Sequence, residues 1–213
     1  IIQELTGLLK TKNIGTDSDR ALLLDFQATL ETKPEKAIKL EKDALAQIEN
    51  ITADNARLVS NLHANLGGLY RMNAHPDLAR EHMEKSISLL DQFNLLHIND
   101  SIPQIANYAM FLTEQQEPER GISELQKLSG IIKEYHSDDC LDYAKVQETL
   151  GTIYLMTANL PQAKTHFKRA FKIYEKIWAD EPEMIEAKYQ EIQELYPQIG
   201  FCIGKNLSGL LTK

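Results

Sequence analysis

The stretch ETLGTIYLMTANLPQAKTHFKRAFKIYEK, from Glu148 to Lys176, carries the clearest structural signal in the sequence. Apolar side chains recur at helical spacing on both sides of a short polar segment that ends at Pro161. Proline fits the first turn of a helix, because its missing N–H has no partner to lose there. The stretch therefore predicts two helices joined by a tight turn, with small residues, Gly151 and Ala163, where the helices touch.

The same pattern recurs along the chain with a period of 42 residues. Gly151, Ala109 and Gly67 are small residues in equivalent positions. Later positions are in turn large, small and large: Tyr154, Leu112 and Tyr70; Ala163, Gly121 and Ala79; Phe167, Leu125 and Met83. Three prolines have the same spacing, Pro34, Pro76 and Pro118, and Pro161 lies one residue late. A fixed period of this length is typical of a solenoid of helical hairpins.

The glycines of this pattern need a physical reason. A glycine inside a helix costs about 1 kcal/mol relative to alanine. Close packing of the two helices of a hairpin supplies the reason, since no large side chain can stand between them. We therefore expect Gly151 to face its partner helix closely and Tyr154 and Phe167 to be largely buried.

The pattern resembles the tetratricopeptide repeat, most clearly at Leu150, Gly151, Tyr154, Ala163, Phe167 and Ala170, and next at Leu66, Gly67, Tyr70, Ala79 and Met83. The usual period of that family is 34 residues, and the longer period of 42 resembles the kinesin-light-chain kind of repeat. The resemblance covers roughly residues 16–196. It implies an all-α, right-handed superhelical solenoid of antiparallel helix hairpins.

We expect one elongated domain over residues 1–213. Residues 1–12 align with the end of a second helix, which predicts a truncated hairpin. Complete hairpins are predicted at about 17–50, 53–94, 101–136 and 137–179, the first with helices Asp17–Thr32 and Pro34–Asn50. Residues 183–213 predict C-terminal capping helices, since terminal repeats are often atypical. The alternative is a helix that needs the next part of a larger protein.

The composition is that of an ordinary soluble chain, with 43% hydrophobic and 25% charged residues. A net charge of −8 argues against a nucleic-acid surface. No apolar run approaches the roughly 20 residues that span a bilayer, and no signal-peptide pattern follows Ile1. Two isolated cysteines, Cys140 and Cys202, favour buried thiols in a reducing compartment. We expect a cytoplasmic protein with no membrane or nucleic-acid partner, and the missing initial Met suggests a processed chain or a piece of a longer one.

No motif points to catalysis, a cofactor or a metal. The six histidines form no paired-ligand spacing, and no phosphate-binding glycine loop or nucleophile elbow is present. The segment from His136 to Cys140 collects metal-capable side chains, but we interpret it as a polar turn with Asp138 or Asp139 as N-cap. We therefore expect that the protein is not an enzyme. An unrecognised active site is a third and much weaker alternative.

The resemblance implies a concave groove lined by the first helix of each hairpin. The family's groove positions, with two neighbouring asparagines, correspond here to Asn61, Ala64, Asn65, Gly68, Arg71, Pro103, Ala106, Asn107, Met110, Thr113, Lys145, Glu148, Thr152 and Leu155. Small side chains leave room for an extended peptide, and an asparagine amide can both donate to and accept from a peptide unit. The alternative for Asn65 and Asn107 is that they tie neighbouring hairpins together.

Two other features of the sequence are possible binding surfaces. The family's clamp for a C-terminal carboxylate falls on Ala64, Gly68, Asn107, Lys145 and Thr149, and only two of these five match. A chaperone C-terminus is therefore not the expected ligand. Lys164, Lys168 and Lys172 form a basic stripe on one helix, which we interpret as a solvated outer face rather than a site for an acidic partner.

The function expected from these features is binding of a protein or peptide in the groove, as a scaffold or sensor domain of a larger protein. Bacterial peptide-sensing regulators with such repeats are one version of this expectation. The alternative is a structural self-association module that uses the glycine-rich C-terminal segment.

Overall fold

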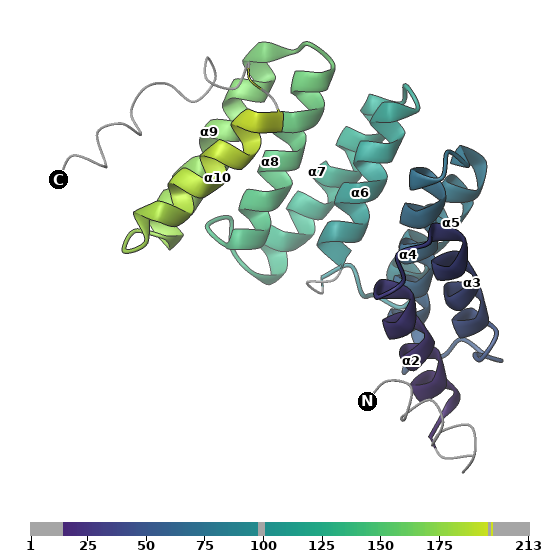
Figure 1. The fold of residues 1–213 in the computed structure, drawn as a ribbon. Helices are drawn as coiled ribbons and strands as arrows, with labels where there is room; N and C mark the ends of the chain where they lie inside the picture. Colours follow the sequence, from purple (N-terminus) through teal and green to yellow (C-terminus); the bar gives the residue numbers. More distant parts are fainter. Residues whose placement is uncertain (1–14, 98–100, 196, 198–213) are drawn as a thin grey trace. The chain divides into compact units, whose positions relative to one another are not determined.

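A computed structural model describes residues 15–97, 101–195 and 197 (Figure 1). Within these residues the regular structure consists of nine α-helices and no strands, which confirms the all-α class. The helices are α2 (Asp17–Thr29), α3 (Pro34–Leu45), α4 (Ala56–Met72), α5 (Pro76–Gln92), α6 (Ser101–Glu114), α7 (Pro118–Tyr135), α8 (Leu141–Met156), α9 (Leu160–Ile177) and α10 (Pro182–Leu195). The hairpins predicted from the sequence are the pairs α2–α3, α4–α5, α6–α7 and α8–α9.

The chain divides into two compact units, Ile1–Tyr108 and Ala109–Lys213, with the boundary inside α6. The expectation of one continuous domain stays a prediction. The predicted truncated hairpin at 1–12 and nearly all of the segment after α10 lie outside the described residues.

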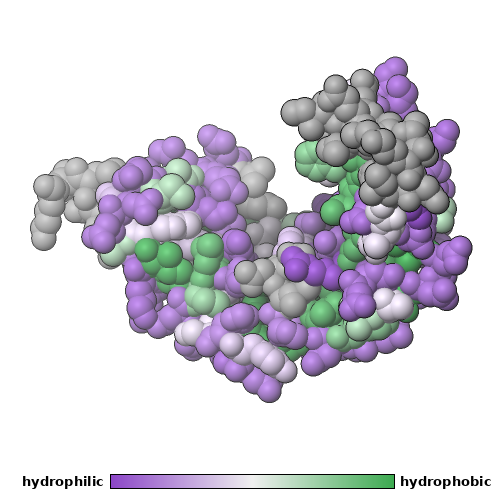
Figure 2. Space-filling view, turned by 90° about the horizontal axis from the view of Figure 1, so that it is seen from below, coloured by the Kyte–Doolittle hydropathy of each residue, from purple (hydrophilic) through white to green (hydrophobic). Residues whose placement is uncertain are grey.

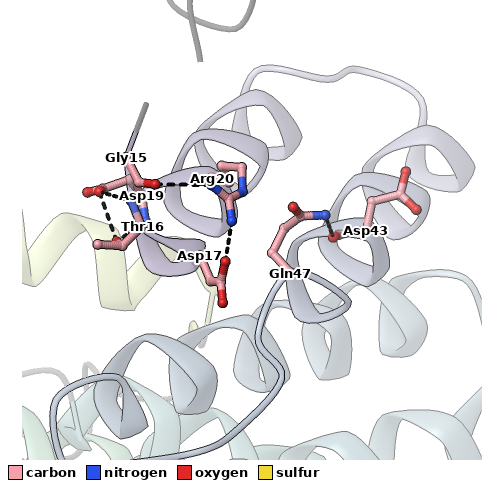
Figure 3. A network of polar contacts seen from close by, with 7 residues as sticks. All are labelled: Gly15, Thr16, Asp17, Asp19, Arg20, Asp43 and Gln47. Atoms are coloured by element: carbon pink, nitrogen blue, oxygen red, sulfur yellow. Dashed lines mark hydrogen bonds and ion pairs between the residues drawn. The ribbon is translucent and has the colours of Figure 1, made fainter. Parts of the chain in front are cut away.

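The first described helix begins with a capping box (Figure 3). Thr16 Oγ1 accepts a hydrogen bond from the backbone N–H of Asp19 at 3.2 Å, and Asp19 Oδ2 accepts one from the N–H of Thr16 at 2.7 Å. Arg20 donates to the carbonyl of Gly15 at 3.0 Å and pairs with the carboxylate of Asp17. The two bonds between Thr16 and Asp19 satisfy backbone N–H groups that have no partner inside the helix and so help to determine where α2 begins.

The core of the first unit forms where α2, α3 and α4 meet. Small residues on the hairpin, Ala21 and Ala44, are fully buried against Leu62 of α4. Partly buried side chains pack around them: Leu24, Leu45, Ile48 and Leu58. In the second unit the largest fully buried side chains include Tyr143, Phe167 and Tyr174. Hydrophilic side chains dominate the face seen in Figure 2, with hydrophobic ones in patches between them.

The predicted close approach at the repeat glycines is confirmed. A Cβ atom on Gly151 would lie 3.0 Å from the ring of Phe167, and one on Gly67 would lie 2.6 Å from Cγ of Met83. On Gly121 it would lie 2.6 Å from the backbone oxygen of Ala109. Real Cβ atoms almost never come as close as 2.6 Å, and a contact of 3.0 Å is tighter than most, so a larger residue at these positions requires a shift in the facing helix.

The turns inside three hairpins also repeat every 42 residues. Ala74, Gln116 and Ala158 have φ values of 56°, 65° and 58°, in the left-handed region. The N–H of the next residue bonds back across the turn in each case, at 2.8–2.9 Å, as in a Schellman motif. The equivalent residue of the first hairpin is Thr32, which is not in this region. A β-branched residue is strongly disfavoured there, and α2 accordingly ends early, at Thr29.

Three predictions are corrected. The first hairpin is shorter than expected, since its helices end at Thr29 and Leu45 rather than at Thr32 and Asn50. The N-cap of α8 is Cys140, whose Sγ accepts from the N–H of Tyr143 at 3.4 Å, and not Asp138 or Asp139.

The third correction concerns Tyr154, which is only half-buried, although Phe167 is fully buried as predicted. A cavity of about 470 Å³ opens beside Tyr154 and is bordered by α7 residues that include Gln126. The equivalent Tyr70 is 4% exposed, and the ammonium of Lys42 lies 5.6 Å from its ring centroid. Gln126 stands two repeat periods after Lys42 and is its counterpart beside Tyr154. Its side chain is shorter than that of lysine and covers Tyr154 less well.

Candidate functional site

A cavity of about 240 Å³ lies within the first unit, between α4, α5 and the first part of α6. Its lining residues are Ala64, Gly68, Arg71, Met72, Met83, Ser86, Gln104 and Asn107. Four of them belong to the predicted groove set: Ala64, Gly68, Arg71 and Asn107. The structure thus brings together residues that the sequence pattern selected from two successive repeats.

The cavity wall is open at Gly68. A Cβ atom built there would have no neighbouring atom within 4 Å, in contrast to the adjacent Gly67. Asn107 is exposed, and Met72 is 81% exposed at the end of α4. The site therefore offers one exposed amide, one apolar side chain and a stretch of helix surface without side-chain cover.

Beneath this wall Gln104 ties three helices together. Its Nε2 donates to Asn61 Oδ1 at 2.6 Å, and its Oε1 accepts from the hydroxyls of Ser60 and Ser86 at 2.8 and 2.6 Å. Both serines are fully buried. Asn61, a predicted groove residue, is thus part of the bracing between α4 and α6.

Asn65 is also used in bracing. Its Nδ2 donates to Asp25 Oδ1 of α2 at 2.8 Å and to Glu41 Oε1 of α3 at 3.2 Å. The amide nitrogen of Asn65 therefore ties neighbouring hairpins together, which is the alternative given for this residue above. Asn107 differs, since it lines the cavity and is exposed.

The remaining groove candidates fall into different environments. Ala106, in the first unit, and Met110, in the second, are half-buried on α6. Thr152 is 9% exposed, and Lys145 is exposed with an ion pair to Asp142 at 3.8 Å. Glu148 accepts from the hydroxyl of Tyr174 at 2.6 Å and pairs with Lys188 of α10 at 3.0 Å. Glu148 therefore braces α8, α9 and α10 of the second unit.

Of the other first-helix positions, Pro103 is exposed, and Thr113 and Leu155 are half-buried. They do not border the cavity of the first unit.

A tyrosine and a histidine stack at equivalent repeat positions in the two units, Tyr70 with His82 and Tyr154 with His166. His82 stacks on Tyr70 with ring centroids 5.4 Å apart, and its Nδ1 lies 2.9 Å from Nδ1 of His63. Burial, then His82 and Lys85, lowers the pKa of His63 to about 4. Burial lowers the pKa of His82 as well. Both imidazoles are therefore neutral near pH 7.

The basic stripe on α9 faces away from the fully buried Phe167 and Ala170. Lys164, Lys168 and Lys172 are all exposed, as the interpretation of a solvated face expects. A neighbouring cation on α9 pairs with an acidic residue that precedes α8. Arg169 lies 3.6 Å from Asp138 and 5.0 Å from the ring centroid of Tyr143. The acidic loop before α8 thus neutralises part of α9.

Sequence reasoning missed Gln104, although a signal was available. The equivalent positions in the neighbouring repeats hold Leu62 and Val146, both fully buried. A glutamine at a position that is otherwise apolar and buried marks a polar network inside the hairpin stack. Met83 was selected only as a large residue of the repeat pattern, and Met72 was not selected at all.

The described residues contain no group of three or more His, Cys, Asp or Glu side chains arranged to hold a metal ion. Among the same residues no helix is both long and apolar enough to cross a membrane.

Comparisons with known proteins agree with this architecture. Residues 101–176 match the family model described as tetratricopeptide repeat. Among curated proteins, none matches the chain. A solved structure that does match is BtubC (BKLC) from P. vanneervenii, 19% identical with a TM-score of 0.67, covering 82% of this chain and 70% of that one.

Two crystal structures of nearly identical TPR-like repeats from Podosopora anserina, whose description refers to a putative kinesin light chain, also match. One of them, a form with a glutamine replaced by methionine, is 12% identical, with a TM-score of 0.69 over 84% of this chain and 85% of that one. The other is 12% identical, with a TM-score of 0.66 over 83% and 85%. At these identities the likeness concerns the fold.

TPR-like repeats generally mediate protein interactions or scaffolding and are generally non-catalytic. The family model and the solved structures together confirm the resemblance that the 42-residue pattern predicted. Residues 101–176 match the tetratricopeptide-repeat family, and the chain has an all-α, TPR-like solenoid fold.

Proposed function

We propose that the chain binds a protein or peptide segment at the cavity between α4, α5 and α6, as a scaffold or sensor domain of a larger protein. The observation that supports this most is the convergence of Ala64, Gly68, Arg71 and Asn107 on one cavity. A peptide ligand needs a channel that is free of side chains, where its backbone can lie. It also needs amide groups of the protein that can form hydrogen bonds with that backbone. The open face at Gly68 and the exposed amide of Asn107 meet these two needs.

The cavity also offers apolar contact. Met83 forms part of its floor at 4% exposure, and Met72 stands at its edge. Methionine side chains are flexible and adapt to ligands of different shape. A ligand with one apolar side chain next to an extended backbone segment would therefore fit the lining.

Self-association through the C-terminal segment stays the alternative, and it depends on residues outside the described part of the chain. Size-exclusion chromatography with light scattering, with and without residues 198–213, separates it from peptide binding. A cytoplasmic location, no nucleic-acid partner and no cofactor stay predictions as well.

The experiment is a selection of peptides from a random display library on the intact protein, followed by titration of the selected peptide. We expect Asn107→Ala to weaken binding by about 5- to 150-fold, the equivalent of about 1–3 kcal/mol for leaving a buried polar partner unsatisfied. We expect Ala106→Trp, one residue before Asn107 on α6, to interfere with binding through its bulk. The control is the double charge reversal of Lys168 and Lys172 to Glu on the outer face of α9, which should change affinity little.

The opposite pattern would contradict the proposal. If the charge reversal abolishes binding while Asn107→Ala leaves it unchanged, the basic face of α9 is the binding surface and the cavity is not.

A further inference from the structure

Glu41 of α3 is a carboxyl group in an unusual place. It is 2% exposed, although it stands on a surface helix of the first unit. A buried carboxylate is strongly disfavoured unless it is paired or hydrogen-bonded, because it has lost its water. The residues around Glu41 therefore have to supply what water no longer does.

One amide group supplies only part of this. Asn65 Nδ2 donates to Oε1 of Glu41 at 3.2 Å and to Oδ1 of Asp25 at 2.8 Å. Two carboxyl groups, from α3 and from α2, thus meet at a single nitrogen of α4. Two negative charges so close together repel each other strongly in a partly buried site.

The second oxygen of Glu41 is unsatisfied as an acceptor. Among the described residues no group donates to Oε2, which is buried. A buried carboxylate oxygen without a donor has lost its hydration and received nothing in return, which destabilises the ionised form. A protonated Oε2 becomes a donor instead, and the facing carboxylate of Asp25 is an acceptor with lone pairs to spare.

We propose that Asp25 and Glu41 share one proton, and that this proton holds the hairpin α2–α3 against α4. The proton turns two repelling carboxylates into a hydrogen-bonded acid–carboxylate pair, with the Asn65 amide bridging both. The pair acts on the docking of α2–α3 whether or not the neighbouring cavity binds a peptide.

The electrostatic environment agrees with this. Burial first, then the charge of Asp25 and a hydrogen bond to it, raises the pKa of Glu41 to about 8, against a small opposing effect of Asn65. Asp25 is the facing charged group on α2, and Asn65 is the polar group on α4. Lys42 follows Glu41 on α3, but its ammonium lies over the ring of Tyr70 and not at the pair.

The direction of the pH dependence follows from this pKa. The folded pKa is raised above the ordinary value of 4.5, so the stabilisation is complete below about pH 4.5. It falls as pH rises and is lost through the folded pKa of about 8. Near neutral pH most molecules still carry the proton, so the docking of α2–α3 is sensitive to small alkaline changes.

The test compares the intact protein with Glu41→Gln, which keeps the shape of the protonated acid and cannot ionise. Backbone hydrogen exchange in α2 and α3 is measured for both proteins at matched pH values from 5 to 9, so that the intrinsic pH dependence of exchange cancels. We expect the protection of the wild type relative to Glu41→Gln to fall by on the order of 100-fold between pH 5 and 8 and then to level off. Equal pH profiles in the two proteins would overturn the proposal.

A second measurement does not depend on how well that variant folds. The carboxyl carbon of Glu41 is followed by NMR in the wild type and in Asp25→Asn, which removes the like charge. We expect the wild-type midpoint well above 6 and a midpoint lower by at least about one pH unit in Asp25→Asn. A wild-type midpoint near the ordinary value for glutamate would show that the pair holds no proton at neutral pH and would overturn the proposal.

Discussion

The hairpins α4–α5 and α8–α9 are separated by 84 residues and repeat the same ring arrangement. Tyr70 stacks on His82 with ring centroids 5.4 Å apart, and Tyr154 stacks on His166 at 5.2 Å. Each histidine then makes one polar contact of 2.9 Å to the first helix of its hairpin. The repeat thus reproduces side-chain geometry as well as helix placement.

The partner in that contact differs. In α4 it is His63, and in α8 it is Gln147. An amide oxygen only accepts, so His166 Nδ1 carries a proton in either charge state of the ring. In α4–α5 two imidazole nitrogens face each other, so one of them must lack a proton. Protonation of both rings would set two donors against each other. A single substitution in a repeated geometry therefore changes how the two hairpins respond to pH.

The largest expected effect concerns the paired glycines of α4. Gly67→Ala should destabilise the first unit by about 1–3 kcal/mol, because its Cβ would lie 2.6 Å from Met83 and 3.3 Å from the oxygen of Ala79. Gly68→Ala, one residue later, should stabilise it by about 1 kcal/mol, because nothing lies within 4 Å and alanine favours the helix. Urea denaturation of the two variants measures both effects. Shifts of the same sign would contradict the assignment of one glycine to the helix contact and the other to the open face.

The next effect sharpens the difference between the two histidine contacts. The pKa of His63 is lowered to about 4 from 6.5, so its stabilisation is complete above about pH 6.5 and is lost as pH falls toward 4. Between pH 7 and 4.5 the wild type should lose about 1–2 kcal/mol more stability than His63→Gln, which copies the glutamine of α8–α9. Comparison at each pH also removes the opposite dependence expected from Glu41.

The reciprocal change is the matched control. Gln147→His should make the stability of α8–α9 newly sensitive to acid, while the stability of the protein at pH 7.5 changes little. If His63→Gln and the wild type lose stability in parallel on acidification, the contact between the two imidazoles does not determine the response.

The smallest effect tests what the two hairpins share. Ala74 and Ala158 both have left-handed φ values, which cost residues other than glycine roughly 1–2 kcal/mol. Part of the gain on replacement is offset by the greater freedom of glycine in the unfolded chain, so Ala74→Gly and Ala158→Gly should each stabilise by about 0.5–1 kcal/mol. Thermal unfolding measures both. Gains that differ clearly between the two would mean that the turns are less alike than their backbone angles indicate.

Much of the fold could be predicted from the sequence because the 42-residue repeat is visible in small residues and prolines, and these act locally. Gly67, Gly121 and Gly151 were assigned to helix contacts from spacing alone, and the structure has them there. The early end of α2 was missed because it depends on one residue: Thr32 stands where the other hairpins tolerate a left-handed conformation.

The candidate site could be predicted less well, because polar side chains on one helical face can turn to a ligand or to a neighbouring helix. Asn65 stands at the same repeat position as Asn107, and Glu148 stands at the position before it. Asn65 and Glu148 nevertheless brace hairpins. What separates them is whether an acidic or basic group faces them from another repeat. Helical spacing within one repeat does not contain that information.

The central claim is that the cavity at Gly68 is the binding surface, and one matched pair of variants tests it most directly. Gly68 and Gly130 are both helical glycines with no atom within 4 Å of an added Cβ, but only Gly68 lines the cavity. We expect Gly68→Trp to weaken binding of a selected peptide by at least about 100-fold while the protein stays folded, and Gly130→Trp to bind like the wild type. Equal affinities of the two variants for that peptide would contradict the claim.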